Sequence, residues 1–151
     1  MYKRIVRRRA RETFRRLSEG EYEFALEGMA RDVRHTYLGD HPCGGTRHSL
    51  EGVRRWFERV YRLFPDLRHE VKAVLVSGGP WDTTVAVQWI GYVKSPRIDE
   101  ALEFDGVHIV RFKWGRVTDV TAYPDSGRVE AYCMELAAKG VAEAEAAPIE
   151  C

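Results

Sequence analysis

The sequence predicts an α+β fold, in which helices pack on the concave face of a cone-shaped, curved β-sheet that is antiparallel or mixed. Three observations support this prediction. Apolar residues recur at spacings of three and four, the helical period, over much of residues 2–64. Between residues 67 and 123 the period changes to two, and after residue 125 the helical period returns. Helices grouped on one side of a curved antiparallel sheet leave an open mouth where a ligand can bind.

Three helices are expected before the long strands. Tyr2–Leu17 has one apolar stripe and an arginine-rich opposite face, which is typical of an amphipathic helix. Glu21–Ala30 is expected to be a second, shorter helix. Ser49 is a favourable N-cap for a third helix that ends near Phe64, because Pro65 follows there.

The strand pattern begins between these helices with a short strand at Val33–Tyr37, followed by a glycine-rich loop at Leu38–Ser49. Longer strands are expected at Leu67–Ser77 and Trp81–Val93, with a polar hairpin loop at Lys94–Ala101. A short C-terminal helix then follows Pro124-Asp125-Ser126 and ends at Gly140, with a buried stripe formed by Val129, Tyr132, Cys133 and Leu136.

The segment Gly106–Asp125 predicts a β-hairpin, because β-branched residues alternate on both sides of Trp114-Gly115. The inward face of this hairpin is expected to carry His108, Val110, Phe112, Thr118, Val120 and Ala122. His108 is a lone imidazole among apolar side chains, and burying it without a partner costs roughly 1–3 kcal/mol. It is therefore either a hydrogen-bonded core residue or a group that faces a cavity.

Composition favours one domain at residues 1–140, followed by an Ala/Glu-rich tail at 141–151 that either continues as a helix or frays. The net charge of +1 gives no general argument for nucleic acid or a membrane as a partner. The three cysteines follow no metal-binding spacing, which favours a reducing, cytoplasmic setting. The arginines of the first helix are expected to be a solvated surface, with phosphate or RNA binding as the alternative. No cofactor motif is present.

Four sequence segments carry a family resemblance: Ser-Glu-Gly-Glu-Tyr-Glu (18–23), Ala-Arg-Asp-Val (30–33), Leu-Phe-Pro-Asp-Leu (63–67) and Trp-Gly-Arg-Val-Thr-Asp-Val-Thr-Ala-Tyr-Pro-Asp (114–125). With these the chain resembles, over residues 1–138, the SnoaL-like polyketide cyclases of the NTF2-like superfamily. That superfamily includes ketosteroid isomerase and limonene-epoxide hydrolase. The resemblance implies a pocket for a small hydrophobic ligand without a cofactor. It leaves open whether the protein is a cyclase- or isomerase-type enzyme or a binding or scaffold domain without catalysis.

The resemblance also implies positions for site residues. The general base of ketosteroid isomerase falls on Tyr37, and its protonated oxyanion-hole aspartate falls on His108. The catalytic positions of limonene-epoxide hydrolase fall near Trp89 and on Ala122, so epoxide hydrolysis is the less favoured chemistry. The acid–base aspartate of polyketide cyclases has its nearest match in Asp125, with Asp119 second.

The candidate catalytic residues are thus His108 and Asp125. Apolar neighbours would keep His108 neutral, so it would donate to an enolate oxygen, while an ionised Asp125 would take the proton. Asp125 has a structural alternative as the N-cap of the last helix. The remaining pocket-lining candidates are Val33, His35, Tyr37, Phe57, Trp89, Val110, Phe112, Val120 and Ala122.

Asp40, His41 and His48 lie in one loop, but their spacing does not indicate a metal site. The outer face of the sheet is expected to pair in a homodimer, because Val107, Ile109, Val117 and Tyr123 would otherwise stand in water.

Overall fold

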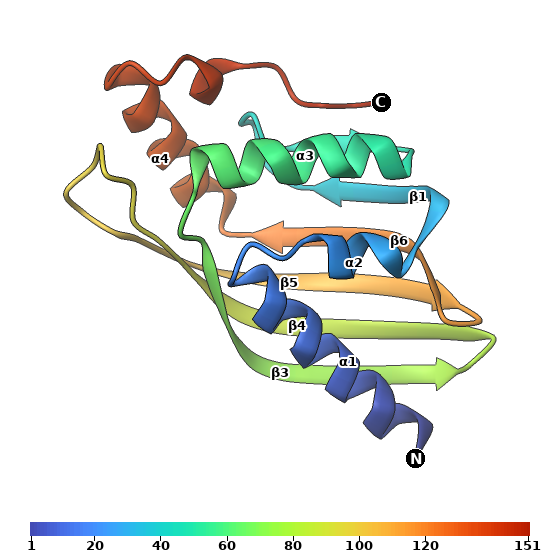
Figure 1. Ribbon diagram of the computed structural model, residues 1–151. Helices are drawn as coiled ribbons and strands as arrows, with labels where there is room; N and C mark the ends of the chain where they lie inside the picture. Colours follow the sequence, from blue (N-terminus) through green and yellow to red (C-terminus); the bar gives the residue numbers. More distant parts are fainter.

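A computed structural model describes all residues, 1–151. One mixed sheet of six strands, in the order β2-β1-β6-β5-β4-β3, carries the helices on one side (Figure 1). Strand β1 runs parallel to β6, and all other neighbours are antiparallel. In chain order the elements are α1 (Tyr2–Leu17), α2 (Glu23–Glu27), β1 (Met29–Tyr37), β2 (Gly45–Arg47), α3 (Leu50–Leu63), β3 (Arg68–Gly79), β4 (Asp82–Val93), β5 (Leu102–Lys113), β6 (Arg116–Pro124), α4 (Ser126–Ala138) and a 3-10 helix, η1 (Ala142–Glu145).

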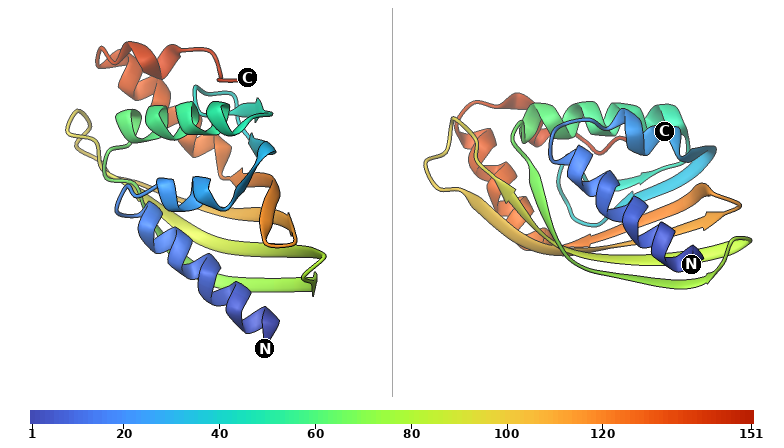
Figure 2. Two further views of the ribbon diagram at one scale, coloured as in Figure 1. Left: turned by 45° about the vertical axis from the view of Figure 1, so that its right-hand side comes forward. Right: turned by 60° about the horizontal axis from the view of Figure 1, so that its bottom comes forward.

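The sheet curves strongly, and α1, α2 and α3 lie on its concave side (Figure 2). α4 follows β6 at the end of the molecule where the loop between β4 and β5 lies (Figure 1). The predicted α+β fold, with helices on the concave face of an unclosed sheet, is confirmed. None of the helices has both the length and the apolar composition needed to cross a bilayer.

The hairpin β5–β6 forms as predicted and turns at two residues. Trp114 and Gly115 have φ angles of 51° and 79°, the two positive values that a type I′ turn requires. A β-bulge between Arg111 and Phe112 leaves Thr118 as the extra residue of β6. The expectation that Thr118 faces inward and Val117 outward was therefore wrong, because the bulge shifts the alternation and Val117 faces the concave side.

The second helix is shorter than predicted, and the first strand is longer. α2 ends before Gly28, and β1 begins at Met29 instead of Val33. The reason is tertiary pairing: Val117 of β6 donates its backbone N–H to the carbonyl oxygen of Gly28 at 2.8 Å, and Met29 pairs with Val117. The loop after β1 also contains the three-residue strand β2, which pairs with the end of β1.

Helix α3 begins as the sequence predicts. The hydroxyl of Ser49 accepts a hydrogen bond from the backbone N–H of Gly52 at 3.0 Å, as an N-cap does. The buried face of α3 carries Trp56, whose indole N–H donates to the carbonyl oxygen of Cys43 at 2.7 Å. This bond attaches the loop between β1 and β2 to the helix.

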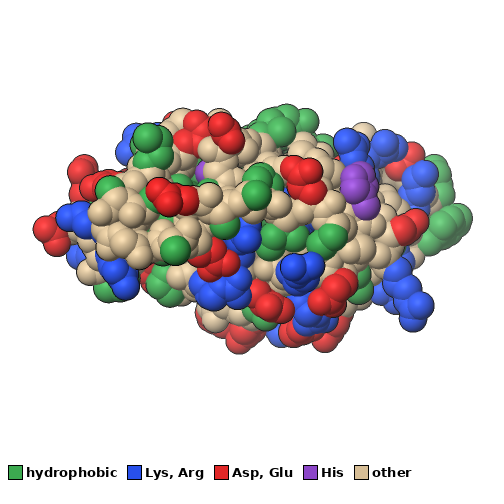
Figure 3. Space-filling view, turned by 90° about the horizontal axis from the view of Figure 1, so that it is seen from above, with side chains coloured by type: hydrophobic (Ala, Val, Ile, Leu, Met, Phe, Trp, Pro, Cys, Tyr) green, Lys and Arg blue, Asp and Glu red, His purple; other side chains and the backbone are tan.

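The C-terminal tail returns along α3. Glu143 of η1 bonds to both Arg59 and Arg62 of that helix, at 3.2 Å and 2.7 Å. Arg59 also donates to the carbonyl oxygen of Ala147 at 2.7 Å. Seen from above, the side on which the chain's C-terminal segment runs, acidic and basic side chains are interspersed on the surface (Figure 3).

Candidate functional site

A cavity of about 350 Å³ lies between the concave face of the sheet and helices α1, α2 and α3. Of the 35 residues around it, 27 are hydrophobic, and none is Asp or Glu. Arg9 is the single Lys or Arg among them. The volume is at the lower end of those that hold small organic ligands, so the cavity suits a compact, largely apolar molecule.

The register of the sheet puts two candidate residues in one row. Tyr37 pairs with Ala122 across β1 and β6, and Ala122 pairs with His108 across β6 and β5. Two strand spacings separate the backbones of Tyr37 and His108 by about 10 Å. Ala122 between them is fully buried, and Tyr37 and His108 both line the cavity.

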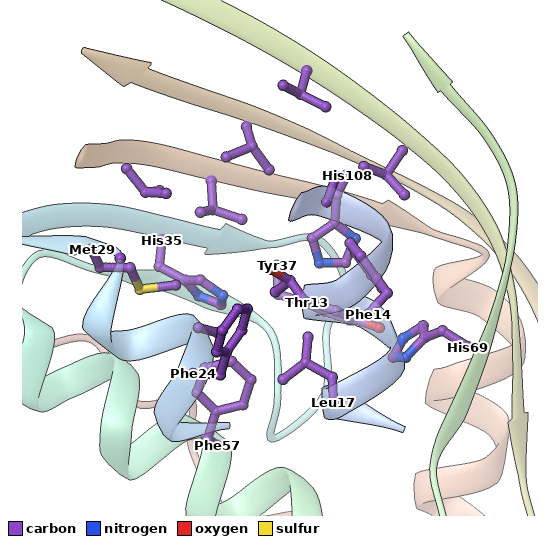
Figure 4. Close-up of a pocket in the computed structure, with 18 of the residues that line it drawn as sticks. Thr13, Phe14, Leu17, Phe24, Met29, His35, Tyr37, Phe57, His69 and His108 are labelled. Carbon is purple, nitrogen blue, oxygen red and sulfur yellow. The ribbon is translucent and has the colours of Figure 1, made fainter. Parts of the chain in front are cut away.

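His108 belongs to the cavity wall (Figure 4), and it forms a side-chain hydrogen bond with Trp89 of the neighbouring strand. The indole N–H of Trp89 donates to Nδ1 of His108 at 2.7 Å. Since an indole nitrogen can only donate, Nδ1 must be unprotonated, and the neutral ring carries its proton on Nε2. The bond from Trp89 is the one side-chain hydrogen bond of His108, and it does not use Nε2. Burial, with a smaller contribution from His69, lowers the pKa of His108 to about 3, so the ring is neutral at pH 7.

His35 comes from β1 and is 2% exposed. Its ring lies 4.5 Å from that of Trp56, and its Nδ1 has no hydrogen-bond partner. Burial first, and then the charges of Arg47 and His108, hold the pKa of His35 well below its usual value. His35 is therefore a neutral imidazole on the cavity wall.

A third imidazole, His69, was missed in the sequence. It stands near the start of β3, with its ring edge-on to Phe14 at 5.3 Å and to Trp89 at 4.7 Å. Burial lowers its pKa to about 4. The signal was present, because His69 shares the strand alternation of the buried Leu67. Phe14 touches both His69 and His108 and lies between them in Figure 4.

Two tyrosines and one cysteine of the wall are also kept in their neutral forms. Burial raises the pKa of Tyr37 and Tyr61, and the hydroxyl of Tyr61 donates to the carbonyl oxygen of Leu17 at 2.6 Å. Burial likewise raises the pKa of the Cys43 thiol, which makes it a poor nucleophile.

The structure places the predicted lining residues in two groups. Seven belong to the cavity wall: His35, Tyr37, Phe57, His108, Val110, Phe112 and Val120. Val33, Trp89 and Ala122 do not, although all three are buried. Ala122 is too short to reach the cavity, Trp89 lies behind His108, and Val33 is covered by the surrounding core.

Asp125, the predicted base, is also outside the wall. It occupies the N-cap position of α4, where its side chain is exposed and makes no capping hydrogen bond. Its backbone N–H donates to the carbonyl oxygen of Asp105 at 2.8 Å. The strand alternation could not show that β6 carries this residue past the end of the cavity. Asp119, the second candidate, lies on the opposite face and faces Arg34 at 3.8 Å.

The loop that holds Asp40, His41 and His48 forms no metal cluster. Nδ1 of His41 accepts a hydrogen bond from the backbone N–H of Cys43 at 3.2 Å, which ties the loop together. No three His, Cys, Asp or Glu side chains of the chain come close enough to hold a metal ion.

The helices contribute cavity residues that the strand pattern could not reveal. α1 supplies Thr13, Phe14 and Leu17, and α2 supplies Phe24, all of which surround the same space as the histidines (Figure 4). The apolar stripe of α1 was visible in the sequence, but its role as one wall of a cavity was not.

Residues 10–120 match the family model of the SnoaL-like domain. The chain belongs to the SnoaL-like domain family. No curated protein matches this SnoaL-like chain.

Solved structures resemble the SnoaL-like chain in fold. An NTF2-like protein of unknown function from Burkholderia pseudomallei K96243 is 20% identical, with 83% of this chain and 94% of that chain covered and a TM-score of 0.71. TerC, crystallised together with polyporic acid, is 19% identical, with 83% and 95% covered and a TM-score of 0.70. IdmH of Streptomyces antibioticus, provisionally assigned as a polyketide cyclase, is 18% identical, with 82% and 94% covered and a TM-score of 0.65.

Proposed function

We propose that this SnoaL-like protein binds a compact, largely apolar carbonyl compound and promotes its enolisation, as an isomerase- or cyclase-type enzyme without a cofactor. The observation that carries the proposal is the bond from Trp89 to Nδ1 of His108. Because this bond leaves the proton on Nε2, His108 can donate it to a carbonyl oxygen in an apolar cavity.

The reaction needs one donor and one base. When a base removes a proton from the carbon next to the carbonyl group, the C–H electron pair forms a C=C bond and the carbonyl π electrons move to oxygen. The hydrogen bond from Nε2 of His108 becomes stronger as negative charge develops on that oxygen. An apolar surrounding increases this gain, because water does not screen the interaction.

We assign the base to His35 rather than to Asp125. His35 is on the cavity wall, while Asp125 is exposed and outside it. Phe14 separates His69 from His108, whereas His35 and His108 border the same open space (Figure 4). Burial makes His35 a weak base, but an enolate anion beside it would stabilise its protonated form.

The test is hydrogen–deuterium exchange of ketone α-protons, because it does not require the natural substrate. A panel of steroid-like and polyketide-like ketones, with 2-tetralone as the simplest, is incubated with the protein in D2O and followed by proton NMR. We expect catalysed exchange, and losses of about 10²- to 10⁴-fold for His108→Ala and for His35→Ala. His48→Ala, an exposed histidine outside the wall, is the matched control.

Asp125→Asn decides between the two candidate bases. If the exchange rate falls with Asp125→Asn and not with His35→Ala, the carboxylate is the base and our assignment is wrong.

The alternative is a small-molecule-binding domain without catalysis. One observation favours it: burial weakens all three imidazoles of the wall as bases, as their low pKa values show. A binding domain would take up the ketones, detected as line broadening, without exchanging their α-protons.

A further inference from the structure

The opening of the cavity carries a positively charged side chain, that of Arg9. Arg9 of α1 belongs to the cavity wall and is exposed. Its guanidinium group lies 5.7 Å from the ring centroid of Phe24, and its Nη2 atom lies 3.3 Å from the point where a Cβ on Gly28 would be. Phe24 and Gly28 are wall residues too. The Arg9 side chain thus extends along the edge of the cavity toward α2 and the start of β1.

Arg9 has no carboxylate partner. The ion pairs of α1 are made by Arg15 and Arg16 instead, and both bond to Glu12, at 2.7 Å and 2.9 Å. These two bonds lower the pKa of Glu12 to about 2, so its charge is already matched by two arginines. Glu23 of α2 is paired with Arg54. The positive charge of Arg9 at the opening is therefore unmatched by any of these acids.

A shallow groove adjoins the cavity and shares three residues with it: Ile5, Arg9 and Phe24. The rest of the groove is formed by Arg8, Arg11, Glu12 and Arg15. With four arginines and one acid, this entrance has a positive potential that attracts anions and repels cations.

We propose that the ligand of this cavity is an amphipathic organic anion, whose apolar body fills the interior and whose oxyanion group is bound by Arg9 at the opening. The proposal rests on the proposed function, because it uses the same cavity. The distribution of charge explains this division: Arg9, which is exposed at the opening, is the one Lys, Arg, Asp or Glu residue of the whole cavity wall. A planar guanidinium group can bind a carboxylate or sulfonate with two parallel hydrogen bonds.

Two fluorescent probes that differ by one charged group test this. 1-Anilinonaphthalene-8-sulfonate has the anion, and N-phenyl-1-naphthylamine has the same aromatic body without it. We expect both to bind and to compete with each other. Arg9→Gln should lower the affinity for the sulfonate probe about five- to tenfold, as expected for the loss of an exposed charge-assisted hydrogen bond. The affinity for the neutral probe should change by less than about twofold. Arg9→Lys should restore part of the loss.

Arg7→Gln is the matched control, because it removes the same charge from the same helix at an exposed position outside the cavity and the groove. If Arg7→Gln and Arg9→Gln lower the affinity for the sulfonate probe equally, the proposal is wrong. The probe is then attracted by the overall positive charge of α1 and not bound by Arg9. If both probes bind and Arg9→Gln affects neither, the anion proposal fails while the cavity remains a binding site. If neither probe binds the unmodified protein, the proposed function fails as well.

Discussion

Trp89 fixes the tautomer of His108 through a 2.7 Å hydrogen bond to Nδ1. The indole is 1% exposed and stands on β4, next to the strand that carries His108. It cannot accept a proton, so any protonation of Nδ1 would break this bond and bury an unpaired N–H. Trp89 thus positions the imidazole from outside the cavity wall.

Trp89→Phe is expected to release this constraint. Without the donor, the Nδ1–H tautomer of His108 becomes accessible, and ¹⁵N NMR of the ring nitrogens should show a mixture instead of Nε2–H alone. The lost bond and the smaller ring should lower the free energy of unfolding by about 1–3 kcal/mol. Trp56→Phe, which loses its bond to Cys43 instead, should leave the His108 tautomer unchanged. A single Nε2–H tautomer in Trp89→Phe would contradict this role.

Gly106→Ala is expected to disturb the same pair from the neighbouring strand. A Cβ at Gly106 would lie 2.4 Å from the indole atoms Cη2 and Cζ2 of Trp89, far inside contact distance. The ring must then move, so we expect overpacking to cost about 1–3 kcal/mol, and the indole fluorescence to shift. Gly127→Ala, on α4, is the control, because its nearest contact would be an ordinary 3.8 Å. Equal unfolding midpoints for the two variants would contradict the prediction.

Stability should fall on mild acidification. The folded-state pKa values of His69 and His108, about 4 and about 3, lie below the ordinary value of 6.5. At a pH between the folded-state pKa and 6.5, the unfolded chain therefore binds more protons than the folded chain. The contribution of these histidines to stability is complete above about pH 6.5 and is lost as the pH falls toward 4. Each such histidine contributes a slope of up to about 1.4 kcal/mol per pH unit.

Urea titrations at several pH values measure this slope. His69→Gln should reduce the slope of the unfolding free energy against pH by roughly the contribution of one proton. Replacing the exposed His48 by Gln should leave the slope unchanged. An identical slope in the unmodified protein and in His69→Gln would show that His69 is not buried as a neutral group.

The homodimer predicted from the sequence would use the outer face of the sheet. Leu75, Ala86, Ile109 and Thr121 form one in-register row across β3, β4, β5 and β6 on that face. Leu75 is 67% exposed in the single chain, and burying such a row would favour pairing of two copies. Sedimentation velocity should show a dimer at micromolar concentration that Ile109→Lys dissociates and Met134→Lys, on α4, does not. A monomeric unmodified protein would refute the dimer.

The sequence predicted the fold and one face of the cavity because both depend on local periodicity. Val110 and Val120 could be oriented by alternation alone. Thr118 could not, because a bulge that shifts the alternation depends on the partner strand. The row that joins Tyr37 to His108 needed the parallel pairing of β1 with β6, which brings together residues far apart in the chain.

The polar site was predictable only in part. His108 was recognisable as an isolated imidazole, but its bond to Trp89 depends on how β4 and β5 pair. A carboxylate suits proton transfer, which is why the sequence favours Asp125 as the base, but nothing local in the sequence shows that it lies exposed and outside the cavity wall. Arg9 could not be distinguished from the other arginines of α1 before the position of α2 was known.

The absence of acids from the wall has a consequence for how the protein responds to pH. His35, His69 and His108 have lowered pKa values, and Tyr37, Tyr61 and Cys43 have raised ones, so burial drives all six toward the uncharged form. These six groups therefore offer a guest the same donors and acceptors throughout the neutral range. An affinity that changes between about pH 6 and pH 8 would then report mainly the titration of the guest, so a binding curve measured against pH would give the acidity of an unknown natural ligand.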